Sequence, residues 1–212
     1  MTIRSPWLFA ACVVLVALTS GGCANVESLG ERYQAPPLGS TWISARSDTG
    51  SYGASSAEVP GKRGEFIWQG KPHITFETSE STIVAQPDGP WVGFFRDGKP
   101  MLTYDPPASY DFPLKVGKTF TKTYRLTNHA TQQVSSSVVT TQIEALEDVV
   151  VKAGTFKTFR VKTSDTLGNE NTVWFSPELG IFVKQMNRRT DKHAQGVGTR
   201  DVELISQTIK KK

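Results

Sequence analysis

Residues 91–104, with the sequence WVGFFRDGKPMLTY, contain the clearest hairpin signal in the chain. Two runs rich in aromatic and aliphatic residues, 91–95 and 101–104, flank the tetrapeptide Arg96-Asp97-Gly98-Lys99. Asp-Gly supplies the positive φ angles that tight hairpin turns require. The stretch therefore predicts two antiparallel strands joined by a short turn.

The sequence on both sides of this hairpin continues as short strand-like runs separated by turn residues. These runs are 41–46, 66–68, 73–77 and 81–85 before the hairpin, and 120–129, 134–144, 149–151, 156–163, 172–175, 181–186 and 202–206 after it. No segment shows a long period of 3.6 residues. We therefore expect an all-β protein of roughly eleven to thirteen strands, folded as an antiparallel β-sandwich or an incomplete β-barrel.

Asp105-Pro106-Pro107 interrupts the series of strands, because proline has no amide hydrogen to donate to a ladder. The interruption predicts a seam between an N-terminal β subdomain, residues 40–107, and a C-terminal β-meander module, residues 108–212. The 212 residues, 38% of them hydrophobic and 21% charged, fit a globular chain and exclude a polytopic transporter.

Three segments of the C-terminal half, 113–120, 147–161 and 172–184, resemble a module of uncharacterised bacterial envelope lipoproteins. The usual form of that module is a V-P-A-G-T-F turn followed by a W-Y-A-P-G-x-G-x-V-K hairpin, and Lys152 stands here where the pattern has its proline. The resemblance implies a half-barrel or sandwich-like sheet and an envelope location. It transfers no catalytic residue.

The N-terminus has the layout of a signal peptide. Arg4 precedes an apolar run, residues 7–18, which is too short for a comfortable membrane span. Small residues 19–22 then lead to Cys23, as in the bacterial lipobox, although Ser20 stands where an aliphatic residue is usual. We therefore expect residues 1–22 to be a cleaved lipoprotein signal peptide and Cys23 to be acylated. An ordinary secretory signal or an uncleaved anchor is the alternative.

The segment after the cysteine predicts how the protein is held. Residues 23–39 are polar, contain Pro36-Pro37 and show no periodicity, which indicates a flexible tether. Ala24 after the cysteine points, by the sorting convention that the lipobox brings with it, to the periplasmic face of the outer membrane. An inner-membrane or secreted location is the alternative.

The charge distribution limits the class of partner. The formal net charge is +4 at pH 7, and the basic residues are scattered except for Arg188-Arg189 and Lys210-Lys211-Lys212. No aromatic-basic alternation typical of a nucleic-acid reader is present, so nucleic acid is not expected as a partner. The lysine tail reads as solvated or as a contact to anionic lipid or polysaccharide.

No catalytic constellation stands out. Asp48-Thr49-Gly50-Ser51 matches the aspartic-protease signature, in which two aspartates share a proton. It is expected in a loop rich in serine and glycine, however, and the only similar sequence, which would supply the second aspartate, begins at Asp165. His73, His129 and His193 are too far apart for a local metal site, so no metal or cofactor is expected. We expect a protein that is not an enzyme, with a hydrolase as the alternative.

Four tryptophans remain after the signal peptide, and aromatic platforms bind sugars and lipid chains. They are Trp42, Trp68, Trp91 and Trp174. Trp91, beside the Gly89-Pro90 turn and the hairpin, is the candidate for ligand binding. The sequence favours a lipid-anchored periplasmic protein that binds an envelope component or a partner protein. The alternative is a carrier that encloses an acyl chain or another small hydrophobic ligand within its sheet.

Overall fold

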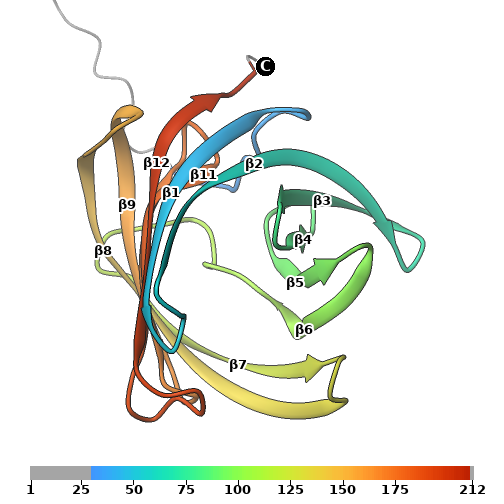
Figure 1. Ribbon diagram of the computed structural model, residues 1–212. Coiled ribbons are helices and arrows are strands. Elements are labelled where there is room, and N and C mark those ends of the chain that lie inside the picture. The colour runs from blue at the N-terminus through green and yellow to red at the C-terminus, as the bar shows by residue number, and fades with distance from the viewer. Residues whose placement is uncertain (1–29, 211–212) are drawn as a thin grey trace, which may run out of the picture.

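The computed structural model describes residues 30–210, and these residues form a single closed β-barrel (Figure 1). The predicted signal peptide and Cys23 therefore lie outside the described residues, as do Lys211 and Lys212. Each strand pairs antiparallel with its neighbours in sequence, and the last pairs with the first. The strands are β1 (Thr41–Gly50), β2 (Ser55–Trp68), β3 (Lys71–Thr78), β4 (Thr82–Ala85), β5 (Trp91–Arg96), β6 (Lys99–Ala108), β7 (Thr119–Asn128), β8 (Gln133–Val151), β9 (Gly154–Asp165), β10 (Asn169–Ser176), β11 (Ile181–Arg189) and β12 (Gly198–Thr208).

The expected all-β antiparallel fold is confirmed, and of the two expected architectures the sandwich is wrong. β12 pairs with β1 along the whole of β1, from Thr41↔Thr208 to Gly50↔Gly198, so the sheet closes on itself. Closure removes both sheet edges, which would otherwise present unpaired N–H and C=O groups. The barrel is thus the expected architecture that the structure supports, and its sheet is closed.

The hairpin predicted at residues 91–104 is confirmed. β5 and β6 pair antiparallel, and the turn between them has positive φ angles at Asp97 (51°) and Gly98 (72°).

The predicted seam falls inside β6. The ladder from β6 to β7 ends at Asp105↔Arg125, just before the prolines, while β6 still pairs with β5 at Ala108. One sheet therefore runs across the seam.

Because the strands alternate in direction, successive turns lie at opposite ends of the barrel. Residues 30–40, which we call the strap, lie at the end where β1 begins, and we call this the strap end. The turns β2–β3, β4–β5, β6–β7, β8–β9 and β10–β11 share it, and the remaining six turns form the far end.

The strap and the β6–β7 loop pack into the strap end. The Leu114 amide donates to the Gly30 carbonyl at 2.8 Å, and the Tyr33 hydroxyl donates to the Gly180 carbonyl at 3.2 Å. The ring of Tyr33 lies 5.9 Å from that of Phe112 and 6.0 Å from that of Phe175. From Gly30 onward, the segment expected to be a tether is therefore fixed to the barrel.

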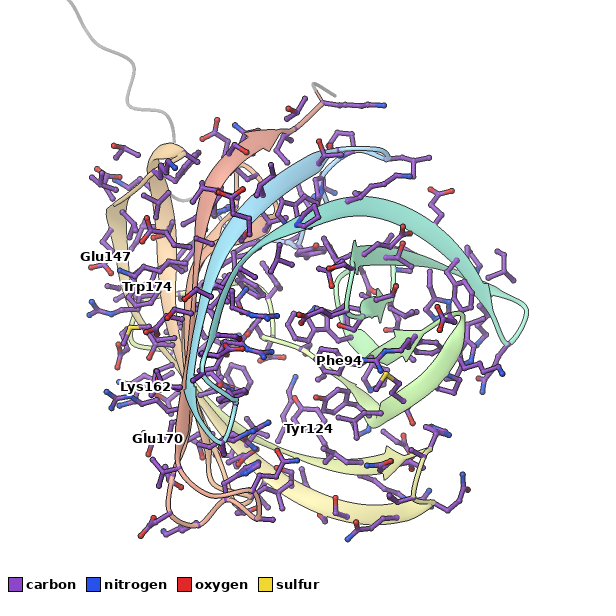
Figure 2. All side chains as sticks on the ribbon, viewed as in Figure 1. Phe94, Tyr124, Glu147, Lys162, Glu170 and Trp174 are labelled. Atoms are coloured by element: carbon purple, nitrogen blue, oxygen red, sulfur yellow. The ribbon has the colours of Figure 1, made fainter. Side chains whose placement is uncertain are left out.

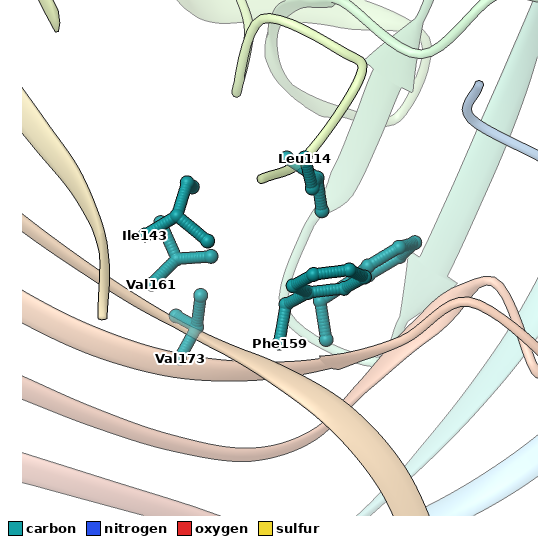
Figure 3. Packing of buried hydrophobic residues seen from close by; sticks show 6 residues of the cluster. Leu114, Ile143, Phe159, Val161 and Val173 are labelled. Carbon is teal, nitrogen blue, oxygen red and sulfur yellow. The ribbon is translucent and has the colours of Figure 1, made fainter. Parts of the chain in front are cut away.

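A cluster of buried apolar side chains holds the β6–β7 loop in place (Figure 3). Ile143, Val161 and Val173 are neighbours across β8, β9 and β10, and Leu114 of the loop packs against them together with Phe159. All five side chains are at most 4% exposed. Burying a side chain of this size stabilises a fold by about 1.5–3 kcal/mol.

A second cluster lies outside the barrel, because the β2–β3 hairpin packs on the outer face of β4 and β5. Phe66 and Trp68 cover Val84 and Phe95 there, and the rings of Trp68 and Phe95 are 5.5 Å apart. Trp174 also faces outward, where its indole N–H donates to Glu147 at 2.9 Å. Two of the four tryptophans are thus outside the barrel.

Candidate functional site: the barrel lumen

The barrel encloses a cavity of about 1170 Å³. This volume exceeds the roughly 300–1,000 Å³ that is typical of small-molecule sites. Figure 2 shows Phe94 and Tyr124 pointing into the space that the strands enclose, whereas Glu147, Lys162, Glu170 and Trp174 lie on the outer side. The lumen is therefore the candidate functional site.

One side of the cavity is apolar. Strands β3 to β6 supply what we call the aromatic wall, which consists of Phe76, Ile83, Trp91, Phe94, Leu102 and Tyr104. The strap and the β6–β7 loop extend it with Tyr33, Tyr110 and Phe112. The ring of Trp91 lies 5.9 Å from that of Phe182 and 6.3 Å from that of Tyr110, in edge-to-face contacts that fix its position.

Burial keeps the tyrosines of this wall protonated. It raises the pKa of Tyr104 to about 12 and also raises the pKa of Tyr110. Desolvation is the main cause in both, because burial penalises the phenolate. These groups are hydrogen-bond donors at neutral pH and do not serve as bases.

The opposite side of the cavity is polar. Strands β8 to β11 supply what we call the polar wall, which consists of Gln133, Ser135, Ser137, Thr141, Thr163, Asn169, Asn171 and Gln185. The Ser137 hydroxyl is buried and has no hydrogen-bond partner in the described part of the chain. A cavity with one apolar and one polar side suits an amphipathic molecule.

Cationic side chains stand at the far end of the polar wall. They are Arg189 of β11 and Lys192 of the β11–β12 turn, and His193 of the same turn also lines the cavity. The pKa of His193 is lowered, first by burial and then by the charge of Arg189, so the imidazole is neutral at pH 7. Its Nδ1 accepts a hydrogen bond from the Gln195 amide at 3.1 Å.

Asp48, the first residue of the protease-like motif, belongs to an ion-pair network on β1 and β12. Arg200 binds both carboxylate oxygens at 2.8 Å, and Arg46 lies 3.2 Å from one of them and also pairs with Glu80. The hydrogen bonds from Arg200 lower the pKa of Asp48. A carboxylate held in this way is a structural anion rather than one that shares a proton with a second acid.

Asp165, the first residue of the similar sequence, accepts hydrogen bonds within the turn that follows it. Its carboxylate accepts hydrogen bonds from the Leu167 and Asn169 amides at 3.0 and 2.8 Å, and from the Asn169 side chain at 2.9 Å. The two carboxylates that supported the hydrolase alternative are therefore each occupied in a separate structural task.

The three histidines lie in three different places. His73 makes an edge-to-face contact with Trp68 on the outer face, His129 Nε2 is 2.9 Å from Thr103 Oγ1, and only His193 lines the cavity. Within residues 30–210, no three His, Cys, Asp or Glu side chains form a group that could hold a metal ion. None of the described residues belongs to a helix long and apolar enough to cross a membrane.

The structure places Trp91, the ligand-binding candidate from the sequence, on the aromatic wall. Trp42 also lines the cavity. Sequence reasoning missed Arg189 and Lys192. The dipeptide Arg188-Arg189 was visible, but its meaning depends on the alternation along β11, where Arg188 is exposed and Arg189 faces inward.

The architecture is thus that of a closed up-and-down β-barrel with a lined internal cavity. No family model matches the chain. No curated protein matches it either.

Solved structures of similar shape come from bacteria. A candidate lipoprotein from Parabacteroides distasonis has a TM-score of 0.42 and 11% identity, covering 84% of this chain and 99% of its own. A candidate exported protein with a YmcC-like fold from Bacteroides fragilis has a TM-score of 0.44 and 13% identity, with the same coverage. The hypothetical lipoprotein YmcC from Escherichia coli has a TM-score of 0.42 and 11% identity, covering 79% of this chain and 84% of its own.

Proposed function

We propose that the barrel is a binding protein of the bacterial envelope that takes a small amphipathic molecule into its lumen. The carrying observation is the cavity of about 1170 Å³ with an aromatic wall facing a polar wall. Apolar surface gains about 25 cal/mol per Å² on leaving water, so an acyl chain is stabilised against the aromatic wall. The polar wall offers amides and hydroxyls to the head of the same molecule.

To test this proposal, a bulky side chain is placed on the inner face of one strand. The same substitution on the outer face of that strand serves as the control. Ser135 and Ser136 are neighbours on β8, but Ser135 lines the cavity while Ser136 is exposed. We expect Ser135→Trp to lower the affinity for a fluorescent acyl probe at least tenfold, because the indole occupies the space of the chain. Ser136→Trp is expected to leave the affinity within about twofold of the parent protein.

Fluorescence titration of the two variants, with circular dichroism to verify folding, provides the measurement. Equal affinities in both variants would place the probe outside the lumen. Native mass spectrometry of protein recovered gently from envelopes then identifies the natural occupant. An added mass of partner-protein size would instead favour the function that the sequence favours, the binding of a partner protein.

We also propose that Cys23 carries a lipid that anchors the protein, at the periplasmic face of the outer membrane. The support is the lipobox-like sequence before Cys23 and the position of the strap. Gly30 follows Cys23 by seven residues, an extended span of about 25 Å, so the acyl group would hold the strap end close to the bilayer.

Replacing Cys23 with serine is expected to move the protein from the membrane fraction to the soluble periplasmic fraction. Cys12→Ser is the matched control, because Cys12 lies within the apolar run that leaves with the signal peptide. Fractionation and intact mass of both variants give the measurement. Membrane retention of the Cys23 variant without an acyl mass would contradict the anchor.

A further inference from the structure

The charged side chains that line the cavity differ in whether they already have a partner within the protein. The carboxylate of Asp165 is occupied by its own turn, and that of Asp111 is paired with Lys118 and Lys122. Asp88 is exposed in the β4–β5 turn at the strap end. Among residues 30–210, by contrast, no ion pair includes Arg189 or Lys192, which line the far end.

The backbone of the β1–β2 turn holds the guanidinium of Arg189 in place. Its Nη1 donates to the Ser51 carbonyl at 3.0 Å, and its Cζ lies 3.8 Å from the centre of the Tyr52 ring. Cation–π contact with tyrosine stabilises a guanidinium without neutralising its charge. The Nε atom is buried and has no hydrogen-bond partner. Arg189 is thus positioned, charged and incompletely satisfied.

Glycines allow the β1–β2 turn to lie close to Arg189 and the β11–β12 turn. Gly198 is the strand partner of both Arg189 and Gly50. A Cβ atom at Gly198 would lie 2.7 Å from the Ser51 amide nitrogen, and one at Gly50 would lie 2.4 Å from the Val197 carbonyl oxygen. The β1–β2 and β11–β12 turns can therefore pack closely together. This packing places the Ser51 carbonyl within hydrogen-bond distance of the Arg189 side chain.

A buried N–H group without a partner is destabilising, and more so when the group is charged. The unpaired Nε of Arg189 and the unpaired hydroxyl of Ser137 both belong to side chains that line the cavity. An anionic group of the ligand would pair with the charge of Arg189, because guanidinium forms strong hydrogen bonds with carboxylate and phosphate oxygens.

We propose that the lumen ligand is an amphiphile with one acyl chain and an anionic head, a carboxylate or a phosphate, and that Arg189 and Lys192 bind this head. This inference rests on the proposed function, since it adds the chemistry of the head group to a ligand already placed in the lumen. The chain runs from the cationic far end toward the aromatic wall.

The test compares a charged probe with a neutral one of the same length. The full-length chain carrying Cys23→Ser, exported without acylation, is titrated with hexadecanoate and with its methyl ester. We expect hexadecanoate to bind more tightly than the ester. Arg189→Gln is expected to lower the affinity for hexadecanoate about tenfold or more and to leave the ester within about twofold. Acetate or inorganic phosphate alone is expected not to bind measurably at millimolar concentration, which distinguishes a lipid head from a free anion.

Two further variants serve as control and backup. Arg188→Gln removes the same charge from the exposed neighbour and is expected to preserve the preference for hexadecanoate. Lys192→Gln, in an exposed turn, is expected to weaken hexadecanoate binding severalfold even if Arg189→Gln fails to fold.

The outcomes separate the two proposals. Equal binding of acid and ester by the parent protein, or an equal loss in the Arg188 and Arg189 variants, would overturn the anionic head and leave lumen binding intact. Tight binding of phosphate or acetate alone would replace the amphiphile by a free anion. No binding of either acyl probe would overturn the proposed function and this inference with it.

Discussion

Replacing Asp48 with asparagine is expected to lower the free energy of unfolding by about 3–5 kcal/mol. The Asp48 side chain is 1% exposed and accepts hydrogen bonds from Arg200 through both oxygens. An asparagine is nearly the same size but leaves the charges of Arg46 and Arg200 without their shared anion. Losing the buried anion is costly because the Arg46 side chain, which is 11% exposed, stays largely desolvated, whereas that of Arg200 is 32% exposed.

The pH dependence of this effect follows from the direction of the pKa shift. The pKa of Asp48 is lower in the folded protein than the roughly 3.9 of an unfolded aspartate. The stabilisation is therefore fully present above about pH 4 and is lost as the pH falls through the folded-state pKa. We expect the difference in stability between the parent protein and the Asp48→Asn variant to be constant from pH 5 to 8 and to shrink below about pH 4.

Asp148→Asn is the matched control. The Asp148 carboxylate is 62% exposed and lies 3.6 Å from Lys157 Nζ, so its removal is expected to cost less than about 1 kcal/mol. Urea unfolding of both variants at several pH values gives the measurement. Similar losses for the two variants, or a difference that grows on acidification, would mean that the network does not hold the barrel closed between β1 and β12.

The parts of the fold that could be predicted from the sequence are those set by neighbouring residues. The hairpin of β5 and β6 followed from Asp97-Gly98 between apolar runs, because the turn chemistry is local. Closure was not predictable in this way. The pairing of Thr41 with Thr208 joins the two ends of the barrel sequence, and neither strand carries a signal that names its partner.

The strap shows the same limit. Its prolines and polar residues are typical of a tether, and nothing local distinguishes Tyr33 from an exposed tyrosine. Its ring packs against Phe112 and Phe175, which belong to a loop and a strand far along the chain. Only the folded barrel creates the site into which the strap fits.

The candidate site was predictable in one of its two halves. Trp91 was singled out because it stands beside the Gly89-Pro90 turn and the hairpin, and it lies on the aromatic wall. Arg189 required the register of three strands. Its inward direction follows from the alternation along β11, and its contact with Ser51 depends on the glycines at positions 50 and 198. Asp48 drew attention through a protease-like motif, but its pairing with Arg200 across β1 and β12 gives it a structural role.

Replacing Phe159 with alanine is expected to destabilise the protein by about 3–5 kcal/mol and to loosen the strap end first. The Phe159 side chain is 3% exposed and packs in the cluster with Leu114, Ile143 and Val161. Its ring also lies against Gly30, where a Cβ atom would come within 2.7 Å of it. The substitution therefore removes the surface on which both the β6–β7 loop and the first strap residue rest.

Phe120→Ala is the control for the loss of an aromatic ring, because Phe120 is only half-buried and contacts the amino groups of Lys118 and Lys122 at 5.6 and 5.2 Å from its centre. This control substitution is expected to lower the free energy of unfolding by about 1 kcal/mol.

Limited trypsin digestion adds a local readout, since Arg32 in the strap and Lys115 in the β6–β7 loop are exposed cleavage sites. We expect the Phe159 variant to be cut at these two positions before the barrel unfolds, because segments with few buried contacts open independently of the core. Cleavage that begins elsewhere, or at the same rate in both variants, would show that the ring of Phe159 does not hold the strap and the β6–β7 loop, and the apolar cluster would then stabilise only the strands.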